Sequence, residues 1–224
     1  MNGSIVIAVD GTAASGKGTL AKQLAQHFGF AHLDSGSLYR LTALALLDSR
    51  GDPTSESDAV KGARSIDLSR AGDPAIRTDV VGRAASQVAA IPAVRKALFA
   101  FQRAFLEHPP GGSEGAVMDG RDIGTVICPL AAAKLFVDAR PEVRAHRRFL
   151  ELKSLGIDRD EAELLNELRA RDHADRNRPV SPMVPAADAD LLDTSDLDID
   201  AALAAALVLV SPKIKEALKA KPRG

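Results

Sequence analysis

The sequence predicts an α/β fold in which a five-stranded parallel sheet is flanked by helices. Two observations carry this prediction. Five short apolar stretches recur along the chain, and segments with helical periodicity separate them. The stretches are apolar on consecutive residues rather than alternate ones, which is typical of parallel strands buried on both faces. At 224 residues the chain is long enough to bury a sizeable core as one domain with small subdomains.

Aspartates follow directly after three of the predicted strands, as Asp34, Asp119 and Asp138. The carboxyl ends of parallel strands open onto the ligand crevice of such a sheet, and Asp119 lies at one of these ends. The predicted strands lie at residues 4–10, 30–33, 116–118, 134–137 and 189–193.

In the first half of the chain, periodicity and capping residues predict three helices and a longer helical region. The first helix ends at Gly29, a typical C-cap, and Asp34 or Ser35 can cap the second. Proline removes a backbone donor and clashes with the preceding turn, so Pro92 should break or kink the long region. We expect residues 66–76 to be irregular. The helical segments are expected at 17–28, 35–50, 55–63 and 78–106.

In the second half, Pro141 opens an arginine-rich helix that runs to about Leu155, in keeping with proline in a first helical turn. A second charged helix is expected at 161–172, followed by a loop with three prolines. The last helix covers 199–220 and is open to interruption at Pro212.

Composition excludes several classes of function. The formal net charge is −1 and the isoelectric point is near 6.5, so no global field favours nucleic acid or membrane as a partner. The lone Cys128 excludes an internal disulfide and a cysteine-based zinc site. No signal peptide is recognised, and the apolar run at 201–210 is too short to span a bilayer. We therefore expect a cytoplasmic monomer whose five histidines, which lack metal-site spacing, serve surface or packing roles.

A phosphate-binding loop follows the first strand. Its glycines let backbone N–H groups curl around an anion, and the start of the next helix adds partial positive charge. Lys17 would reach the outer phosphates of a nucleotide, and Thr19 would face a magnesium ion. Ser or Thr usually follows the lysine directly, whereas Gly18 intervenes here. The residues expected to bind the nucleotide cofactor are Gly11, Thr12, Ala13, Ala14, Ser15, Gly16, Lys17, Gly18 and Thr19.

Two residues outside the loop indicate the same chemistry. Asp119 ends a buried strand, where a phosphoryl-transfer enzyme places the carboxylate that orders Mg²⁺ through water, although a helix or turn cap is the alternative. Arg40 lies one strand–helix unit from the loop, where residues face the ligand crevice, although a surface arginine is the alternative. Within the loop, the methyl group of Ala14 is tolerable only if φ stays negative.

The motifs resemble those of bacterial cytidylate kinases. The Gly-Lys-Gly-Thr end of the loop is similar to the phosphate loop of nucleoside monophosphate kinases, which are P-loop proteins. The resemblance runs from residue 5 to about residue 200, through several separate motifs in one order. These are DSGSLYR at 34–40, ASQVA at 85–89 with Arg95, DGRDIGT at 119–125 and RDHADRNR at 171–178.

The resemblance implies a single kinase domain, 1–224, with three parts. The acceptor-binding part looks reduced, because only residues 65–77 stand where many relatives have a β-rich insert. The parts are a P-loop NTPase-type core at 1–34, 108–140 and 186–224, acceptor-binding helices at 35–107 and a lid at 141–185.

The resemblance also implies roles for acceptor-side residues. A carboxylate that accepts from the exocyclic N4 group of cytosine is chemically sensible at Asp122. The residues implied to bind the acceptor phosphate are Arg40 and Arg121, with Ser35 nearby. Those implied to bind cytosine are Ser86, Arg95 and Asp122.

In the lid region, nine arginines and one lysine fall between residues 140 and 178. Planar guanidinium groups suit phosphate oxygens, although two solvated helices of mixed charge are the alternative. By resemblance, Arg178 would contact the phosphates during transfer, and Arg147 would stack on adenine. Arg171 and Asp175 would hold the acceptor, Asp175 through a ribose hydroxyl. Lys17, Arg121 and Arg178 would be the catalytic residues.

The implied reaction moves the γ-phosphoryl group of ATP, with Mg²⁺, to CMP or dCMP, giving CDP or dCDP without a covalent protein intermediate. One alternative is another small P-loop kinase that acts on UMP, AMP or a shikimate-type acceptor. A second alternative is a nucleotide-dependent switch without turnover, although acceptor-side arginines argue against it, because a switch has no second phosphate to hold.

Overall fold

A computed structural model describes residues 4–221, which divide into two compact units. The larger, called here the sheet unit, comprises the chain up to Leu33 and from Leu106 onward. The smaller, called the helical unit, comprises Asp34–Phe105. No helix within residues 4–221 combines the length and the apolar character that a membrane crossing needs.

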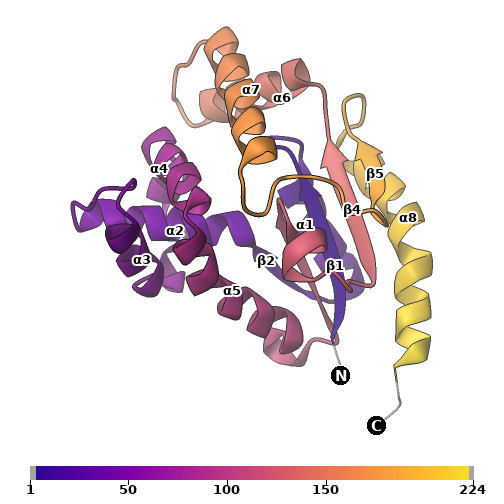
Figure 1. The fold of residues 1–224 in the computed structure, drawn as a ribbon. Coiled ribbons are helices and arrows are strands. Elements are labelled where there is room, and N and C mark those ends of the chain that lie inside the picture. The colour runs from indigo at the N-terminus through magenta and orange to yellow at the C-terminus, as the bar shows by residue number, and fades with distance from the viewer. Residues whose placement is uncertain (1–3, 222–224) are drawn as a thin grey trace. The chain divides into compact units, whose positions relative to one another are not determined.

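The sheet is five-stranded and parallel, as predicted, with the strand order β2-β3-β1-β4-β5 (Figure 1). The central strand β1 is buried along its whole length, as a strand with neighbours on both sides and cover on both faces should be. The strands are β1 (Ile5–Gly11), β2 (Ala31–Asp34), β3 (Gly115–Gly120), β4 (Ala133–Asp138) and β5 (Asp190–Asp193).

Helices α1 (Lys17–Phe28) and α8 (Ile199–Ala220) pack together on one face of the sheet. Their apolar sides meet alternate residues of β1, so that Ile7, Leu24 and Val210 are fully buried in one core. This packing holds the phosphate loop between β1 and α1 on a rigid base.

The possible interruption of the last helix at Pro212 is absent, because α8 runs through it. Val210 and Ile214 on either side of the proline are fully buried in the core, which holds the helix in line. The backbone acceptor that loses its partner belongs to Val208, a residue that is mostly exposed and so can be hydrated.

Helices α6 (Pro141–Ser154) and α7 (Glu161–Asn177) pack against each other in the sheet unit. The predicted end of α7 at residue 172 is wrong by five residues. A buried ion pair fixes Asp172, and the Asn177 side chain donates to the His173 carbonyl one turn earlier. These contacts carry the helix to the point where the proline-rich loop begins.

The helical unit contains α2 (Ser35–Asp48), α3 (Glu56–Arg64), α4 (Asp79–Ala90) and most of α5 (Pro92–Glu107). Of the two residues predicted as possible caps of α2, Asp34 is the cap, and Pro92 separates α4 from α5, as predicted. The irregular stretch forms two short 3₁₀ turns, η1 (Leu68–Gly72) and η2 (Pro74–Arg77).

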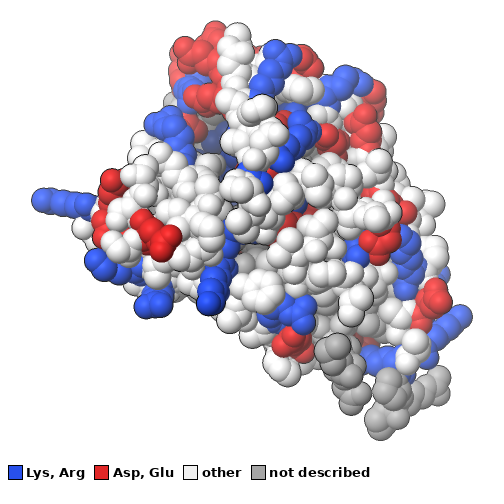
Figure 2. Space-filling model, viewed as in Figure 1, with Lys and Arg blue, Asp and Glu red and all other residues white. Residues whose placement is uncertain are grey.

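On the face shown in Figure 2, acidic and basic side chains are interspersed, in keeping with the net charge near zero.

Candidate functional site

The phosphate loop joins β1 to α1. Gly11 has φ +148°, and a Cβ atom there would lie 1.9 Å from the carbonyl oxygen of Val137 on β4, so only glycine fits. Gly16 has φ +86° and forms the N-cap of α1. The helix therefore begins close to the carboxyl end of β1, and the first N–H groups of a helix are a site where an anion can bind.

The expectation that Ala14 keeps a negative φ is wrong, because its φ is +58°. The residues around it hold it in this left-handed conformation. The Ala13 carbonyl accepts from Arg144, the Ser15 hydroxyl donates to the Thr12 carbonyl, and the Ser15 carbonyl accepts from Thr194. Such over-determination is how strained backbone persists at functional sites.

Lys17 and Thr19 lie on the first turn of α1. The Lys17 ammonium group donates to the Thr12 carbonyl at 3.2 Å, which places its charge over the loop. Thr19 is exposed, and its neighbour Gly18 leaves space on the side that faces Asp119. Thr12, in turn, is fully buried and donates to the Asp138 carboxylate at 2.6 Å.

Asp119 is buried near the end of β3 and is the carboxylate beside this turn. Its Oδ2 atom is 3.5 Å from the position of a Cβ on Gly18, and its Oδ1 atom is 2.9 Å from His32 Nε2. Among residues 4–221, no cluster of three or more His, Cys, Asp or Glu could hold a metal by itself. One carboxylate beside a phosphate loop nevertheless fits Mg²⁺, which is bound through few protein ligands together with phosphates and water.

Two arginines and two aspartates form a cluster. Arg121 and Asp122 directly follow β3, and Asp175 and Arg178 lie at the end of α7. Arg121 Nε donates to Asp175 at 2.9 Å, and Arg178 lies 3.5 Å from Asp122 and 4.0 Å from Asp175. All four side chains are at least four-fifths buried. The structure thus brings together three residues implied to bind the acceptor, Arg121, Asp122 and Asp175, and Arg178, which is implied to meet the phosphates in transfer.

The pKa of Asp175 reflects this charge balance. Burial acts to raise it, but the guanidinium of Arg121, followed by those of Arg171 and Arg178, outweighs burial and holds the pKa below its usual range. Asp175 is therefore charged at neutral pH and fixes the arginines in place.

Sequence reasoning missed Asp10, which holds the backbone that directly follows Arg121 and Asp122. Both of its carboxylate oxygens accept backbone N–H groups, from Ile123 at 2.8 Å and from Gly124 at 2.7 Å. Burial raises its pKa to about 6, although the two N–H groups act to lower it. The contact fixes the π-helical turn η4 (Ile123–Ile127), which directly follows Arg121 and Asp122. A charged residue inside an otherwise apolar central strand was the available signal.

Sequence reasoning also missed Arg144, a fully buried arginine on α6. It donates to Asp172 at 2.6 Å, to the Ala139 carbonyl at 2.8 Å and to the Ala13 carbonyl at 3.2 Å. It therefore connects α7 to the phosphate loop.

Arg147 lies about one turn after Arg144 on α6, and hydrogen bonds hold the edge of its guanidinium group. It donates to the Thr194 carbonyl at 2.6 Å, to the Thr194 hydroxyl at 3.1 Å and to the Leu197 carbonyl at 3.2 Å. A guanidinium fixed in this way has a set plane. Arg171, the remaining predicted lid residue, is half-buried on α7, where its charge acts on Asp175.

The helical unit holds the other four predicted acceptor residues. Arg40 on α2 donates to the Ile76 carbonyl at 2.6 Å and lies against Gly82 of α4, whose carbonyl accepts from Ser86 at 3.2 Å. Arg95 is buried on α5 and stacks over the ring of Tyr39, with its guanidinium carbon 5.7 Å from the ring centroid. Ser35 is buried at the start of α2.

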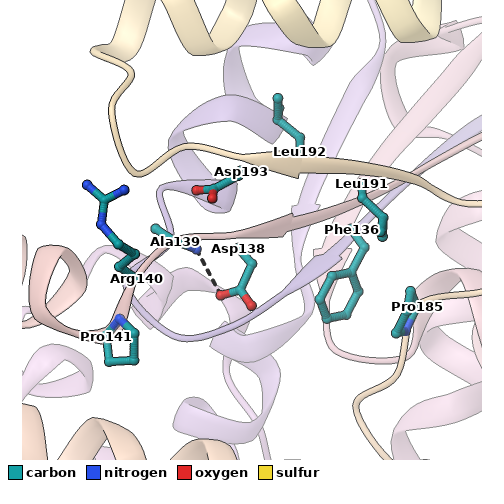
Figure 3. A pocket seen from close by; sticks show the side chains of 9 residues that line it. All are labelled: Phe136, Asp138, Ala139, Arg140, Pro141, Pro185, Leu191, Leu192 and Asp193. Atoms are coloured by element: carbon teal, nitrogen blue, oxygen red, sulfur yellow. Dashed lines mark hydrogen bonds between the residues drawn. The ribbon is translucent and has the colours of Figure 1, made fainter.

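A pocket of about 430 Å³ lies at the carboxyl ends of β4 and β5 (Figure 3). Phe136, Pro185 and Leu191 form its apolar end. At its polar end, Asp138 accepts from Thr12 and from the Ala139 N–H, and Arg140 pairs with Asp196. The predicted site residues lie outside its lining, so this pocket is not the predicted nucleotide site.

Comparisons with known proteins agree with one another. A family model described as cytidylate kinase matches residues 7–211. A cytidylate kinase of Nitrobacter winogradskyi is 53% identical over 206 residues, which cover 92% of this chain and 95% of that protein. One of Rhodopseudomonas palustris is 55% identical over the same length and shares of both chains. A solved structure of an uncharacterized protein from Eubacterium ventriosum, 16% identical with a TM-score of 0.51, covers 92% of this chain and 98% of its own and shows a shared fold alone.

Proposed function

The chain belongs to the cytidylate kinase family, and from this premise we propose which of its residues bind the nucleotides and which neutralise charge during transfer. Membership makes it an ATP-dependent phosphotransferase that converts CMP or dCMP to CDP or dCDP. The identity above 50% across most of the chain sets aside the kinases of other acceptors and the switch without turnover.

On the donor side, residues 11–19 bind the phosphates of ATP, and Lys17 contacts the outer ones. Asp119 would order Mg²⁺ through water, and Thr19 would face the ion; when bound, the ion would supply positive charge to the phosphate oxygens. Arg147 stacks on the adenine, because its N–H edge is engaged by carbonyls and a flat face remains for the base.

On the acceptor side, Arg40 binds the CMP phosphate with Ser35 beside it, and Ser86 and Arg95 bind the base. Asp122 accepts from the cytosine N4 group. The remaining acceptor contacts come from Arg121 and Arg171 to the phosphate and from Asp175 to a ribose hydroxyl.

The transfer proceeds in line, and the protein contributes positioning and charge rather than a covalent step. Lys17, Arg121 and Arg178 neutralise the charge that gathers on the transferred group. Their carboxylate partners Asp122 and Asp175 hold the two arginines in place before substrate binds. Residues 141–185 act as a lid that excludes water, which would otherwise accept the phosphoryl group.

The observation that carries this proposal is the buried arginine cluster in the same unit as the phosphate loop, because it holds guanidinium donors in fixed positions where a second phosphate-bearing substrate can bind. A coupled assay of ADP release with CMP, dCMP, UMP and AMP tests it. We expect the highest kcat/KM with CMP or dCMP. Greater turnover with UMP or AMP, or equal ADP release without any acceptor, would contradict the assignment.

A further inference from the structure

His32 lies on β2 and contacts the carboxylate that ends the neighbouring strand β3. Its Nε2 atom is 2.9 Å from Oδ1 of Asp119. The His32 side chain is one-quarter exposed, whereas that of Asp119 is 5% exposed. The histidine therefore reaches from the rim of the sheet to a carboxylate that is otherwise enclosed.

The two oxygens of Asp119 face different groups. An ionised carboxylate only accepts hydrogen bonds, so the hydrogen between the two residues belongs to His32 Nε2. Oδ1 is held by this donor, and Oδ2 lies toward Gly18, on the turn of α1 that also carries Lys17 and Thr19. A terminal carboxylate has broad rotational freedom, which a fixed donor on one oxygen removes.

We propose that His32 is a positioning residue for the magnesium site, and that it acts by holding Asp119 so that Oδ2 faces the ion and its waters. This inference rests on the proposed function of Asp119. Donors that orient a ligating carboxylate typically change metal affinity 10- to 100-fold when removed. Because Asp119 acts through water, the lower end of that range applies.

A role in stability alone makes a different prediction. Removing the His32 donor leaves the buried Asp119 carboxylate without this hydrogen bond, so H32L should unfold at a lower temperature than wild type. A purely structural contact would lower the unfolding midpoint and leave the metal affinity of the folded protein unchanged, whereas a positioning residue changes that affinity. These two readouts separate positioning from packing.

The length of the replacement side chain provides a matched test. Glutamine places its amide nitrogen where His32 Nε2 lies, asparagine places it nearer the backbone at the level of Nδ1, and leucine supplies no donor. We would compare His32→Gln, His32→Asn and His32→Leu with wild type by titrating Mn²⁺ into the ATP-bound protein and recording the free ion by electron paramagnetic resonance. Expected results are about 10-fold weaker Mn²⁺ binding in H32L and H32N and near wild-type binding in H32Q.

The Asp119→Asn background tests the route of the effect. If His32 acts through Asp119, adding H32L to D119N causes no further loss of Mn²⁺ affinity. Equal Mn²⁺ affinity in all the single variants, a loss in H32Q as large as in H32L, or an additive loss in the double variant would each overturn the inference. ATP affinity without divalent metal should stay the same, and metal affinities are compared at a temperature where every variant is folded.

The failure of the proposed function has a separate signature. It would show as wild-type protein that makes no ADP in response to CMP, whatever the metal affinities are. Wild-type turnover with CMP combined with unchanged Mn²⁺ binding in H32L would overturn only the role of His32.

Discussion

At the scale of single residues, Lys17 places its charge over the phosphate loop, 3.2 Å from the Thr12 carbonyl. Replacing it with methionine keeps the length of the side chain and removes the charge. We expect Lys17→Met to lower kcat by about two to four powers of ten, the scale of losing preorganised charge stabilisation. Steady-state assays measure this. Lys22→Met, an exposed position on the same helix, is the control, and near-normal turnover in K17M would contradict the role.

Asp122 decides base choice in the proposed arrangement. Removing an acceptor that reads the N4 group should lower the preference for CMP over UMP by about tenfold, within the range of one base-reading contact. The loss of its charge beside Arg178 will also reduce overall turnover, so the ratio of kcat/KM values is the measurement. An Asp122→Ala variant with an unchanged CMP-to-UMP ratio would show that the base is read elsewhere.

Ala14 bears strain that the sequence does not reveal. A left-handed φ costs an alanine about 1–2 kcal/mol, and glycine avoids that cost while losing more entropy on folding. Ala14→Gly should therefore raise the free energy of unfolding by about 0.5–1 kcal/mol, measured by urea denaturation. Ala13→Gly is the control. Ala13 has no positive φ, so this variant gains no relief from strain and should be less stable than wild type. A less stable A14G would mean that the strain is relieved in solution.

At the scale of elements, Arg144 links α6, α7 and the phosphate loop. Removing one partner of a buried ion pair leaves the other charge uncompensated, so Arg144→Met should lower the free energy of unfolding by about 3–5 kcal/mol. Arg169→Met on α7 removes an exposed pair with Glu142 and should change the free energy of unfolding far less than Arg144→Met does. Similar losses in the two variants would contradict the structural role of the buried pair.

The local parts of the fold were predictable from sequence. Apolar runs, the C-cap Gly29, the N-cap Asp34 and Pro92 act over a few residues, and the structure has each where the pattern places it. The end of α7 and the continuity of α8 were not predictable, because a buried ion pair and a packed core override the local signals there.

The same division holds in the site. The phosphate loop and the strand-end aspartate Asp119 follow from spacing alone. The contacts that set their geometry join residues distant in sequence: Asp10 with Gly124, Arg144 with Asp172, and His32 with Asp119. No periodicity encodes such pairs, so they emerge only once the strands are ordered.

At the scale of the whole molecule, pH should act on stability through the buried carboxylates. Asp175 has a pKa held below 3.8, so its ionised form stabilises the fold above about pH 4, and this contribution is lost as pH falls through the folded pKa. Asp10 acts in the opposite direction, because its pKa of about 6 means that ionisation costs stability as pH rises from about 4 to about 6.

A comparison of wild type with Asp175→Asn isolates the first effect, since Asp10 is present in both. Free energies of unfolding from urea titrations between pH 3 and 7 should show wild type more stable by a constant amount above about pH 4.5. Below about pH 4 the gap should narrow. A gap that stays constant down to pH 3 would remove Asp175 from the acid response.

Gly11 is required by the packing of the sheet and not by a bound nucleotide. A side chain at this position would collide with the backbone of β4 whether or not a nucleotide were present, so the sheet itself forbids replacement. Gly16 differs, because open space surrounds the position of its Cβ and backbone conformation alone favours glycine there. A descendant of this chain that had lost its catalytic role would still have to keep the first glycine. Gly11 is therefore a sign of the fold, whereas Lys17 is a sign of the phosphate chemistry.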